Sequence, residues 1–480
     1  MQISVLSTQP SSEEAAGLSV FDSETMSANP ELMRRLREGT STADLAAPPV
    51  VLPDFCHKEK SEMPSSIAVA TRGSLRPTLT DAALNCGMAL AVLDAERPTD
   101  AAVTAFYRSV RERYPNPPGW RRELTRAEVV RAAVEGGNFA ADRYGVTESD
   151  LDHVEERARL DIDGYGGAAS AHAELPWMVQ QLARLRFGDI GPSTHFLELQ
   201  EVEEVLDPVA AAHLGIAAGQ VTVQFHNGGG VLTSQLGELY ARRKAASRQM
   251  RMLMSVQKPL THISSARSVA QLRSRFEQFF TAGTPSIPVQ GEDGRRVMLA
   301  TRLAMNYGFA YRLATYATLR QIAATELGGS LRLVVDSPHN SIYEEEVGGA
   351  PAFVHRHNAC RALPAEMMGS HPVFSQTGQP VLLPGTNRTS SYLCVPASTA
   401  YRSLYTACHG SGSIISSFER RGLSLPDPAG RRTLRFGYSD AAPREVPHLD
   451  DNGVNEALRI LTDNGLVRPV ARMRPFAVLT

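Results

Sequence analysis

The stretch QVTVQFHNGGG, residues 220–230, carries the clearest structural signal in the sequence. Its apolar residues Val221, Val223 and Phe225 alternate with polar ones, a period of two that predicts a strand with one buried face. By the same alternation His226 falls on the polar face, where the strand runs into three glycines. The stretch therefore predicts an imidazole at a strand end, next to flexible backbone.

Further strands are expected on both sides of this one, at 195–202, 331–335 and 352–357, separated by Gly, Pro and Asn. Between about 232 and 327 the apolar residues instead recur every three or four positions, which predicts a helical segment. Within it, the GEDGRR stretch at 291–296 is interpreted as an exposed turn. Strands before and after a helical block favour an α+β architecture, with the helical segment inside one domain.

The first residues differ in composition from the rest of the chain. Residues 1–45 are rich in Ser, Thr, Glu and Ala, with one short helix expected after Asn29 and Pro30. We expect them to form a variable, partly ordered segment ahead of one compact domain at 46–480.

The amino-acid composition argues against a membrane protein and against a protein stabilised by disulfides. The 480 residues are 42% hydrophobic and 21% charged, as in a globular protein with a large core. No apolar run approaches the ~20 residues that cross a bilayer, and the first residues lack a signal-peptide pattern, so a cytoplasmic protein without a membrane partner is expected. Five cysteines, an odd number without regular spacing, argue against a disulfide framework and favour a thiolate ligand.

The net charge of -2 gives no overall nucleic-acid signature. One basic segment stands out, and it is interpreted as a solvated helix face. Its residues are Arg242, Arg243, Lys244, Arg248 and Arg251.

Four residues form a candidate metal site. His195 opens one predicted strand, His226 closes another and His339 follows a third, while Cys86 lies in the sequence LNCGM. Imidazole and thiolate are ligands that borderline transition metals prefer. Taken singly, each residue has a commoner explanation, because a histidine at a strand end usually only makes a hydrogen bond and a lone cysteine usually packs as a small apolar residue.

The segments around these residues resemble, in chain order and over roughly residues 50–480, the motifs of the RtcB family of RNA ligases. The matching motifs are LNCGM (84–88) with D-I-G-C-G-M, THFLELQ (194–200) with G-N-H-F-L-E-I, FHNGGG (225–230) with H-S-G-S-R-G, PHNSIYEEEV (338–347) with H-N, VHRHNACRALP (354–364) with H-R-K-G-A-T-R-A-F-P, GQPVLLPGTNRTSSY (378–392) with G-x-x-x-x-P-G-S-M-G-T-x-S-Y, CHGSGSIIS (408–416) with H-G-A-G-R-x-M-S, and the terminal ARMRPFAVLT (471–480).

The resemblance implies an RtcB-like fold and a ligase that depends on GTP and Mn²⁺. Such an enzyme joins an RNA 3'-phosphate or 2',3'-cyclic phosphate to a 5'-hydroxyl. It also implies that His409 attacks the α-phosphate of GTP and becomes guanylylated, a role suited to a neutral imidazole. RNA ends such as tRNA halves are the implied substrates, and an archease-like activator is a further implied partner.

The same resemblance assigns the other site residues. Cys86, His226 and His339 would complete one metal position, and Cys86 with His195 would begin a second. Glycines in the nucleotide motifs would let backbone N–H groups approach phosphate closely. The implied nucleotide-binding residues are Thr194, Glu198, Asn340, Pro384, Gly385, Thr386, Asn387, Ser391, Gly410, Ser411 and Gly412.

Several positions depart from the family pattern. The metal-bridging aspartate is replaced by Ala83, and on a strand Asp81 would share the side of Ala83, so it would substitute only after a backbone shift. The arginine of the nucleophile motif is Ser413, which offers no bidentate fork for phosphate. The lysine next to the C-terminus is Leu479, and Gly230 stands where another arginine would be.

Two further places concern histidines. The family's early D-V-H-x-G-K-G motif keeps its aspartate as Asp54, but its histidine position holds Cys56. His355 and His357, two apart on a predicted strand, point the same way, and a polar role near RNA is favoured over an additional metal pair.

These departures leave two functions open. The first is a GTP- and Mn-dependent RNA ligase, supported by His409 and the four metal residues. The alternative is a homologue that lost guanylylation and acts as a metal-dependent phosphoesterase or as a binder of RNA ends without ligation. RNA contacts are expected mainly at the terminal phosphate and backbone, because the candidate groups include no aromatic stacking platform.

Overall fold

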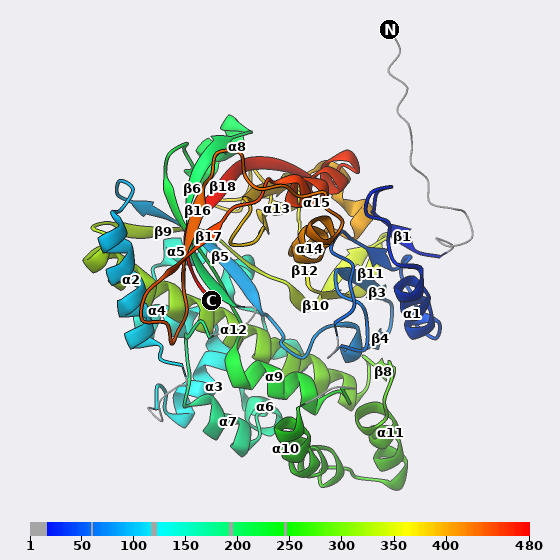
Figure 1. Cartoon of the computed structure of the whole chain (residues 1–480). Coiled ribbons are helices and arrows are strands. Elements are labelled where there is room, and N and C mark those ends of the chain that lie inside the picture. Colours follow the sequence, from blue (N-terminus) through cyan, green and yellow to red (C-terminus); the bar gives the residue numbers. More distant parts are fainter. Residues whose placement is uncertain (1–16, 59–60, 117–121, 192–194, 244–246) are drawn as a thin grey trace.

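The computed structural model describes residues 17–58, 61–116, 122–191, 195–243 and 247–480. Its largest element is a mostly antiparallel sheet (Figure 1). Along this central sheet the strand order is β13 (Val381–Leu383), β14 (Ser391–Pro396), β18 (Val467–Leu479), β6 (Phe196–Val205), β7 (Val221–Asn227), β5 (Gly87–Asp94) and β9 (Ser330–Pro338). The hairpin of β16 (Arg432–Phe436) and β17 (Arg444–Pro447) attaches to β18.

A second sheet has the order β1 (Ser19–Val20), β2 (Val50–Val51), β3 (Ile67–Thr71), β11 (Ala350–His357) and β10 (Asn340–Val347). The chain passes from the central sheet to this one where β9 ends and β10 begins, which leaves His339 at the junction. Two short ladders pair β12 (Ala359–Arg361) with β15 (Thr406–Cys408), and β4 (Ser74–Leu75) with β8 (Ile287–Pro288).

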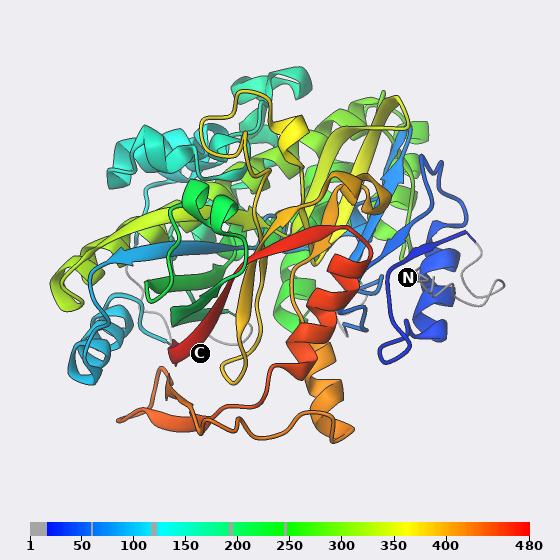
Figure 2. The same ribbon diagram turned by 90° about the horizontal axis from the view of Figure 1, so that it is seen from above.

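The described helices are α1 (Pro30–Thr40), α2 (Asp100–Arg113), α3 (Arg126–Glu135), α4 (Gly137–Tyr144), α5 (Glu148–Leu151), α6 (Gly167–Glu174), α7 (Trp177–Ala183), α8 (Pro208–Leu214), α9 (Gly230–Leu239), α10 (Arg248–Lys258), α11 (Val269–Phe280), α12 (Glu292–Glu326), α13 (Ala365–Met368), α14 (Gly412–Arg420) and α15 (Asn452–Asp463). α14 and α15 pack side by side (Figure 2).

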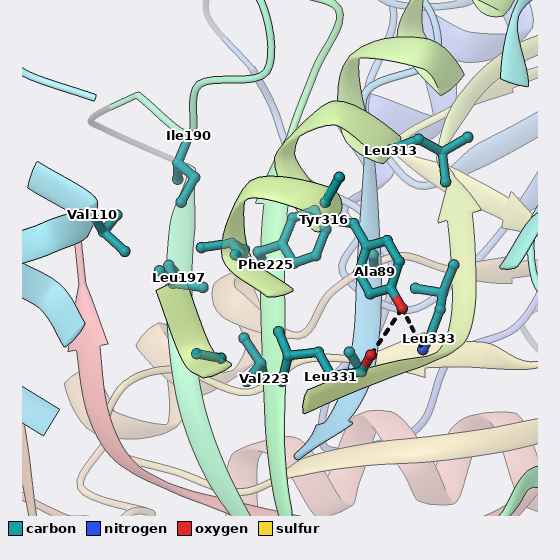
Figure 3. Close-up of a cluster of buried hydrophobic side chains, with 14 of the residues drawn as sticks. Ala89, Val110, Ile190, Leu197, Val223, Phe225, Leu313, Tyr316, Leu331 and Leu333 are labelled. Carbon is teal, nitrogen blue, oxygen red and sulfur yellow. Dashed lines mark hydrogen bonds between the residues drawn. The ribbon is translucent and has the colours of Figure 1, made fainter. Parts of the chain in front are cut away.

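The long helix α12 covers one face of the central sheet. Tyr316 of this helix lies among the apolar side chains of β7 and β9, including Phe225, and its hydroxyl donates to the Leu331 carbonyl at 3.0 Å and accepts from the Leu333 N–H at 3.2 Å (Figure 3). Burying an aromatic ring of this size stabilises the fold by roughly 1.5–3 kcal/mol. Because strand residues alternate, the odd-numbered residues of β7 fill this core and its even-numbered residues face the other side.

All four strands expected from the sequence are confirmed, as β6, β7, β9 and β11. The predicted helical segment is also confirmed, although it is divided into α9, α10, α11 and α12, with a π-helical turn at Pro259–Ile263. The GEDGRR interpretation was wrong, because α12 already begins at Glu292. Gly291 is its N-cap, and two acidic residues in the first turn suit the positive end of the helix dipole.

The helix expected after Asn29 is confirmed as α1, and the Asn29 side chain accepts hydrogen bonds from the first-turn N–H groups. Met33 and Leu36 of α1 are buried, and β1 pairs with β2. Within the described ranges, no helix has both the length and the apolar character needed to cross a membrane.

Candidate metal and nucleotide site

Four of the predicted site residues meet because the central sheet is antiparallel. β5 begins just after Cys86 and β6 just after His195, while β7 ends at Asn227, one residue past His226. β9 ends just before His339. Since β6, β7, β5 and β9 are neighbours in this order, the starts of two strands lie beside the ends of the other two.

The donor atoms converge closely enough to hold one metal ion. The Cys86 Sγ lies 3.3 Å from the His226 Nε2 and 3.6 Å from the His195 Nε2, and the Nε2 atoms of His226 and His339 are 3.1 Å apart. Ligands at Zn–S and Zn–N lengths and tetrahedral angles stand about 3.3–3.6 Å apart. Cys86, His226 and His339 are all buried, and their donor atoms all lie within 4.8 Å of one another, so these residues fit a divalent transition metal.

Burial sets the protonation of these groups. It raises the pKa of the Cys86 thiol to about 12, opposed by the nearby charge of Arg312, and it lowers the pKa of His339 well below its usual range. The imidazole is therefore neutral, as a ligand must be, whereas the thiol releases a proton only when a metal replaces it. Arg312 of α12 also donates to the Asn85 carbonyl and forms a buried bidentate pair with Asp336 of β9, which fixes the backbone next to Cys86.

His409 lies directly against this cluster. It follows β15, and its ring stacks on the ring of His339 with centroids 3.6 Å apart and an interplanar angle of 19°. Its centroid is 5.0 Å from that of His226. Burial, with the charges of Lys58 and His195, lowers the pKa of His409 to about 3, so this imidazole keeps a lone pair for nucleophilic attack.

The residues after His409 form the N-terminus of α14, and the carboxylate of Asp54 caps it. Asp54 Oδ1 accepts from the Ser413 N–H at 2.7 Å and from its hydroxyl at 2.5 Å. Burial raises the pKa of Asp54, and the bonds from Ser413 oppose that shift. Asp54 itself adopts a left-handed backbone conformation, with φ 67°, which asparagine and aspartate tolerate better than most residues.

The predicted nucleotide loop lies beside this helix start. The Ser411 hydroxyl donates to the Pro384 carbonyl at 2.7 Å, and the Gly385 N–H donates to the Ser391 Oγ at 3.1 Å. A Cβ at Gly385 would stand 2.1 Å from the Ser390 carbonyl oxygen, so only glycine fits this turn. Thr386, Asn387, Gly410 and Gly412 belong to the same two segments, so the structure brings these predicted residues together.

Glu198 connects to that loop through Gln200. The Gln200 side-chain amide donates to the Glu198 carboxyl at 2.9 Å and to the Ser391 Oγ at 3.2 Å. Burial raises the pKa of Glu198 to about 8, although the bond from Gln200 lowers it. A mostly protonated carboxyl at neutral pH can donate a hydrogen bond as well as accept one.

Asn340 is committed to holding the backbone around the site. Its side-chain amide donates to the Ala83 carbonyl at 3.2 Å, and its side-chain oxygen accepts from the Asn358 N–H at 2.8 Å. The remaining predicted nucleotide residue, Thr194, lies outside the described residues.

The structure corrects the expectation for Asp81 and Ala83. They do not lie on a strand, because residues 81–86 form a turn in which Asn85 is left-handed with φ 56°. Asp81 instead accepts from the Ala83 N–H at 2.9 Å and lies 3.6 Å from the His357 Nε2. Burial would raise the pKa of Asp81, but the bond and charge of His357 lower it well below its usual range.

The two histidines of β11, His355 and His357, lie in different surroundings. His355 accepts from the Arg76 N–H at 3.1 Å and contacts the Val69 carbonyl, which marks it as part of the core. His357 lies beside Asp81 and Ser61, near the turn that carries Cys86.

Two structural features were not predicted from the sequence: the charge that Lys58 brings to the site and the burial of Leu479. Lys58 follows the early Asp54 motif, donates to Asn358 at 3.0 Å and contributes charge at Cys86, His339 and His409. Its position within the motif was the available signal. Leu479 is buried in the core with Leu197, on the face of the sheet opposite Glu198, because Val478 is the residue that pairs with Glu198.

The chain is similar to a known protein family and to several of its members. The family model "RtcB: tRNA-splicing ligase RtcB" matches residues 40–480. The chain is 28% identical over 378 residues to a tRNA-splicing ligase RtcB of Pyrococcus horikoshii, an alignment that covers 75% of this chain but only 39% of that relative, so the chain spans about two fifths of its length.

Two further relatives are aligned over most of their length. An RNA-splicing ligase RtcB of Mycobacterium tuberculosis is 28% identical over 354 residues, which cover 71% of this chain and 73% of that protein. A tRNA-splicing ligase RtcB of Thermococcus kodakarensis is 27% identical over 435 residues, which cover 85% of this chain and 82% of that protein. With its motifs gathered at one site and a family match from residue 40 to residue 480, the chain belongs to the tRNA-splicing ligase RtcB family.

Proposed function

We propose that this protein joins an RNA 3'-phosphate or 2',3'-cyclic phosphate end to a 5'-hydroxyl end, with GTP and Mn²⁺, through a guanylylated His409. The observation that supports this most is that the His409 ring stacks on the His339 ring, with centroids 3.6 Å apart. His339 belongs to the buried cluster of Cys86, His226 and His339. A neutral imidazole beside a set of candidate metal ligands supports the proposed role of His409 as the nucleophile.

The steps follow from the residues. An imidazole nitrogen of His409 forms a bond to the α-phosphorus of GTP, and pyrophosphate leaves. Where the RNA ends in a 2',3'-cyclic phosphate, water first opens the ring and leaves a 3'-phosphate and a 2'-hydroxyl. An oxygen of the RNA 3'-phosphate then takes the GMP group from His409. The 5'-hydroxyl oxygen attacks the RNA phosphorus, loses its proton to solvent and displaces GMP to form the phosphodiester.

The backbone N–H of Gly410 lies next to His409, where a phosphate oxygen would need it. The Gly385 N–H already donates to the Ser391 Oγ and helps to hold the neighbouring loop in place.

The metal would be held by Cys86, His226 and His339, with His195 at 3.6 Å from the thiol as a further ligand. When bound, a divalent ion neutralises phosphate oxygens and stabilises the leaving group. RNA ends such as tRNA halves as substrates, an archease-like activator and a cytoplasmic location are parts of the same proposal, as is a single domain at 46–480.

A second candidate function rests on Asp54. Its carboxylate already occupies the N-terminus of α14, and Ser413 stands where the family has an arginine, so this helix end offers less to a nucleotide phosphate. Ala83 supplies no carboxylate for a second metal. A homologue that keeps one metal but lacks guanylylation would be a phosphoesterase or a binder of RNA ends.

One experiment separates the two candidates. The protein is incubated with Mn²⁺ and GTP labelled on the α-phosphate, and label on the denatured chain is measured for wild type, His409→Ala and the exposed control His213→Ala. The ligase proposal expects label on wild type and His213→Ala and none on His409→Ala. Label that persists in His409→Ala would refute the nucleophile, and an unlabelled wild type that removes terminal phosphate from RNA would favour the second candidate.

A further inference from the structure

A basic groove with an aromatic wall lies on the helical side of the molecule, apart from the site described above. It has a volume of about 570 Å³ and opens between α10 and α11. These two helices lie at the lower edge of the molecule in Figure 1. The residues that line it and matter here are Arg242, Arg251, Lys258, Phe276 and Phe280.

The cationic side of the groove comes from α10. Arg251, Ser255 and Lys258 recur at spacings of four and three, so they form one stripe on the helix, and all three line the groove. Arg251 is exposed and has no ion-pair partner among the residues that the structure describes.

The interpretation of this basic segment as a solvated helix face holds for Arg248 and Arg251, which are exposed on α10. It was wrong for Arg242 and Arg243, because both precede the helix and Arg243 is buried. Lys244 lies outside the described residues.

The other wall is aromatic. Phe276 and Phe280 of α11 are parallel, with centroids 5.6 Å apart and an interplanar angle of 7°, and Phe276 is 58% exposed. An exposed ring beside the exposed Arg251 guanidinium can stack against a planar base while the cation binds its phosphate. This is the stacking platform that the sequence alone did not reveal. Arg242 also lines the groove, and its guanidinium donates to the Phe280 carbonyl at 3.1 Å.

One wall of the groove contacts the segment that carries Cys86. Arg243, which also lines it, donates to the carbonyls of Thr80 and Pro77, at 2.5 and 2.8 Å. Thr80 precedes Asp81 in the segment that continues to Cys86. Glu238 also lines the groove, and burial is the main cause that raises its pKa. The charge of the nearby Asp81 carboxylate raises this pKa further, so the two carboxylates lie close together.

We propose that this groove binds a single-stranded segment of the RNA substrate, with a base stacked on Phe276 and backbone phosphates on Arg251 and Arg242. The inference rests on the RNA-end function proposed above, and it adds where the strand next to the reacting end is held. A single strand is favoured over a duplex because stacking on Phe276 requires an unpaired base face.

The test measures RNA binding without ligation. A fluorescent 12-nucleotide single-stranded RNA with a 3'-phosphate is titrated with the full-length protein, without GTP, at several salt concentrations. Phe276→Ala should weaken binding by roughly five- to 150-fold, the range of base stacking on an aromatic side chain. Arg251→Ala should also weaken RNA binding. The slope of the logarithm of the binding constant against the logarithm of the salt concentration should become less steep by about 0.7, the value for one phosphate contact on a single strand.

Two control variants keep the test specific. Arg273→Ala on α11 removes an exposed cation that pairs with Glu277 and does not line the groove, so it should bind RNA as wild type does. Val256→Ala removes an exposed apolar side chain of α10 that also does not line the groove, and it too should have no effect.

The outcomes separate this inference from the proposed function. If Phe276→Ala and Arg251→Ala both bind RNA as wild type does, or if a blunt duplex binds as tightly as the single strand, the groove proposal is overturned. A change of oligomeric state in these variants without a change in RNA binding would identify a protein interface and overturn it as well. Loss of RNA binding in a protein whose wild type is never guanylylated would support the groove while the ligase proposal fails.

Discussion

Cys86 is the residue through which the candidate metal site is built, since its sulfur lies within 3.6 Å of two imidazole nitrogens. Its backbone is held from three sides, by Arg312 on the Asn85 carbonyl, by Asn340 on the Ala83 carbonyl and by the start of β5. A ligand on a fixed backbone loses little entropy when a metal binds. The site is therefore prepared for a metal before one arrives.

At the residue scale, Cys86→Ala should abolish stable metal binding. We expect the wild type to hold about one divalent transition metal per chain, because three donors converge at ligand distances, and the variant to hold well under half of that. Elemental analysis after preparation without chelators, and after reloading, measures this. Cys56→Ala, at a half-buried cysteine outside the cluster, is the control. A wild type that holds no metal and takes none up would contradict the prediction.

Glu198 gives a pH-dependent prediction. Its pKa is raised by burial to about 8, above the ordinary glutamate value of 4.5, so the folded state binds more protons than the unfolded state between these values. Its contribution to stability is thus present below about pH 4.5 and is lost as pH rises through about 8. Relative to Glu198→Gln, the wild type should lose on the order of 3–5 kcal/mol of unfolding free energy between pH 5 and pH 9.

Denaturant unfolding of both proteins at these two pH values measures the difference. The glutamine keeps the shape of the side chain and does not titrate, so it serves as the matched control. Equal pH dependence in the two proteins would show that Glu198 stays ionised or is exposed to water.

Individual residues also show which parts of the candidate site could be predicted from the sequence. The candidate metal residues were proposed from the resemblance and from their places at strand ends, and the structure brings them together because an antiparallel sheet aligns such ends. The turn at 81–86 could not be found, since its geometry depends on a left-handed Asn85 held by Met305 and Arg312 of a distant helix. Leu479 was identified as a departure from the family, but its side chain faces the core because a register shift separates Pro475 from Ala477.

At the scale of elements, the cap of α14 connects the N-terminal motif with His409, the proposed nucleophile. Asp54 satisfies N–H groups of a helix that begins three residues after His409. A helix end satisfied in this way keeps the adjacent loop in place.

Asp54→Ala should lower the unfolding free energy by about 1–2 kcal/mol, the usual effect of losing an N-cap. Asp54→Asn should lose less, because asparagine still accepts from the Ser413 N–H and tolerates the left-handed backbone at φ 67°. Chemical denaturation of the three proteins gives the order. A greater loss for asparagine than for alanine would mean that the charge of Asp54, not its cap, matters for stability.

The helical elements were predicted in part. The periodicity from residue 297 onward identified α12, because a helix of this length keeps one face on the sheet. The break between α10 and α11 was not visible, since the π-helical turn at Pro259–Ile263 follows from a proline without an N–H, and periodicity does not register this. The groove that this break creates was missed with it.

At the scale of the whole molecule, both large sheets draw strands from distant parts of the chain. The second sheet joins residues 19–71 to residues 340–357, and the central sheet joins residues 87–94 to residues 467–479. The α+β class followed from the sequence, but this strand order could not, because the pairing partners are not neighbours in the chain.

We expect one main thermal unfolding transition, because neither of the two large sheets can be removed without breaking strands from both halves of the chain. Scanning calorimetry with metal bound measures this, and a chelator should move the whole transition to lower temperature, since the metal ligands lie on strands shared by the body of the molecule. Two well-separated transitions, of which only one responds to the chelator, would show two independent units.

The late position of β18 has a consequence for how the protein is made. β18 lies between β14 and β6, so β6 keeps an open edge until the ribosome has produced β18, roughly 260 residues later. At about 5–20 residues per second that wait lasts on the order of 13–50 seconds, during which an unpaired strand edge could associate with other nascent chains. Glu201, Glu203 and Glu204 lie along that part of β6, and in the finished protein Arg472 and Arg474 of β18 pair with the latter two. The same carboxylates that later receive the arginines would keep the waiting edge charged, and so soluble, during synthesis.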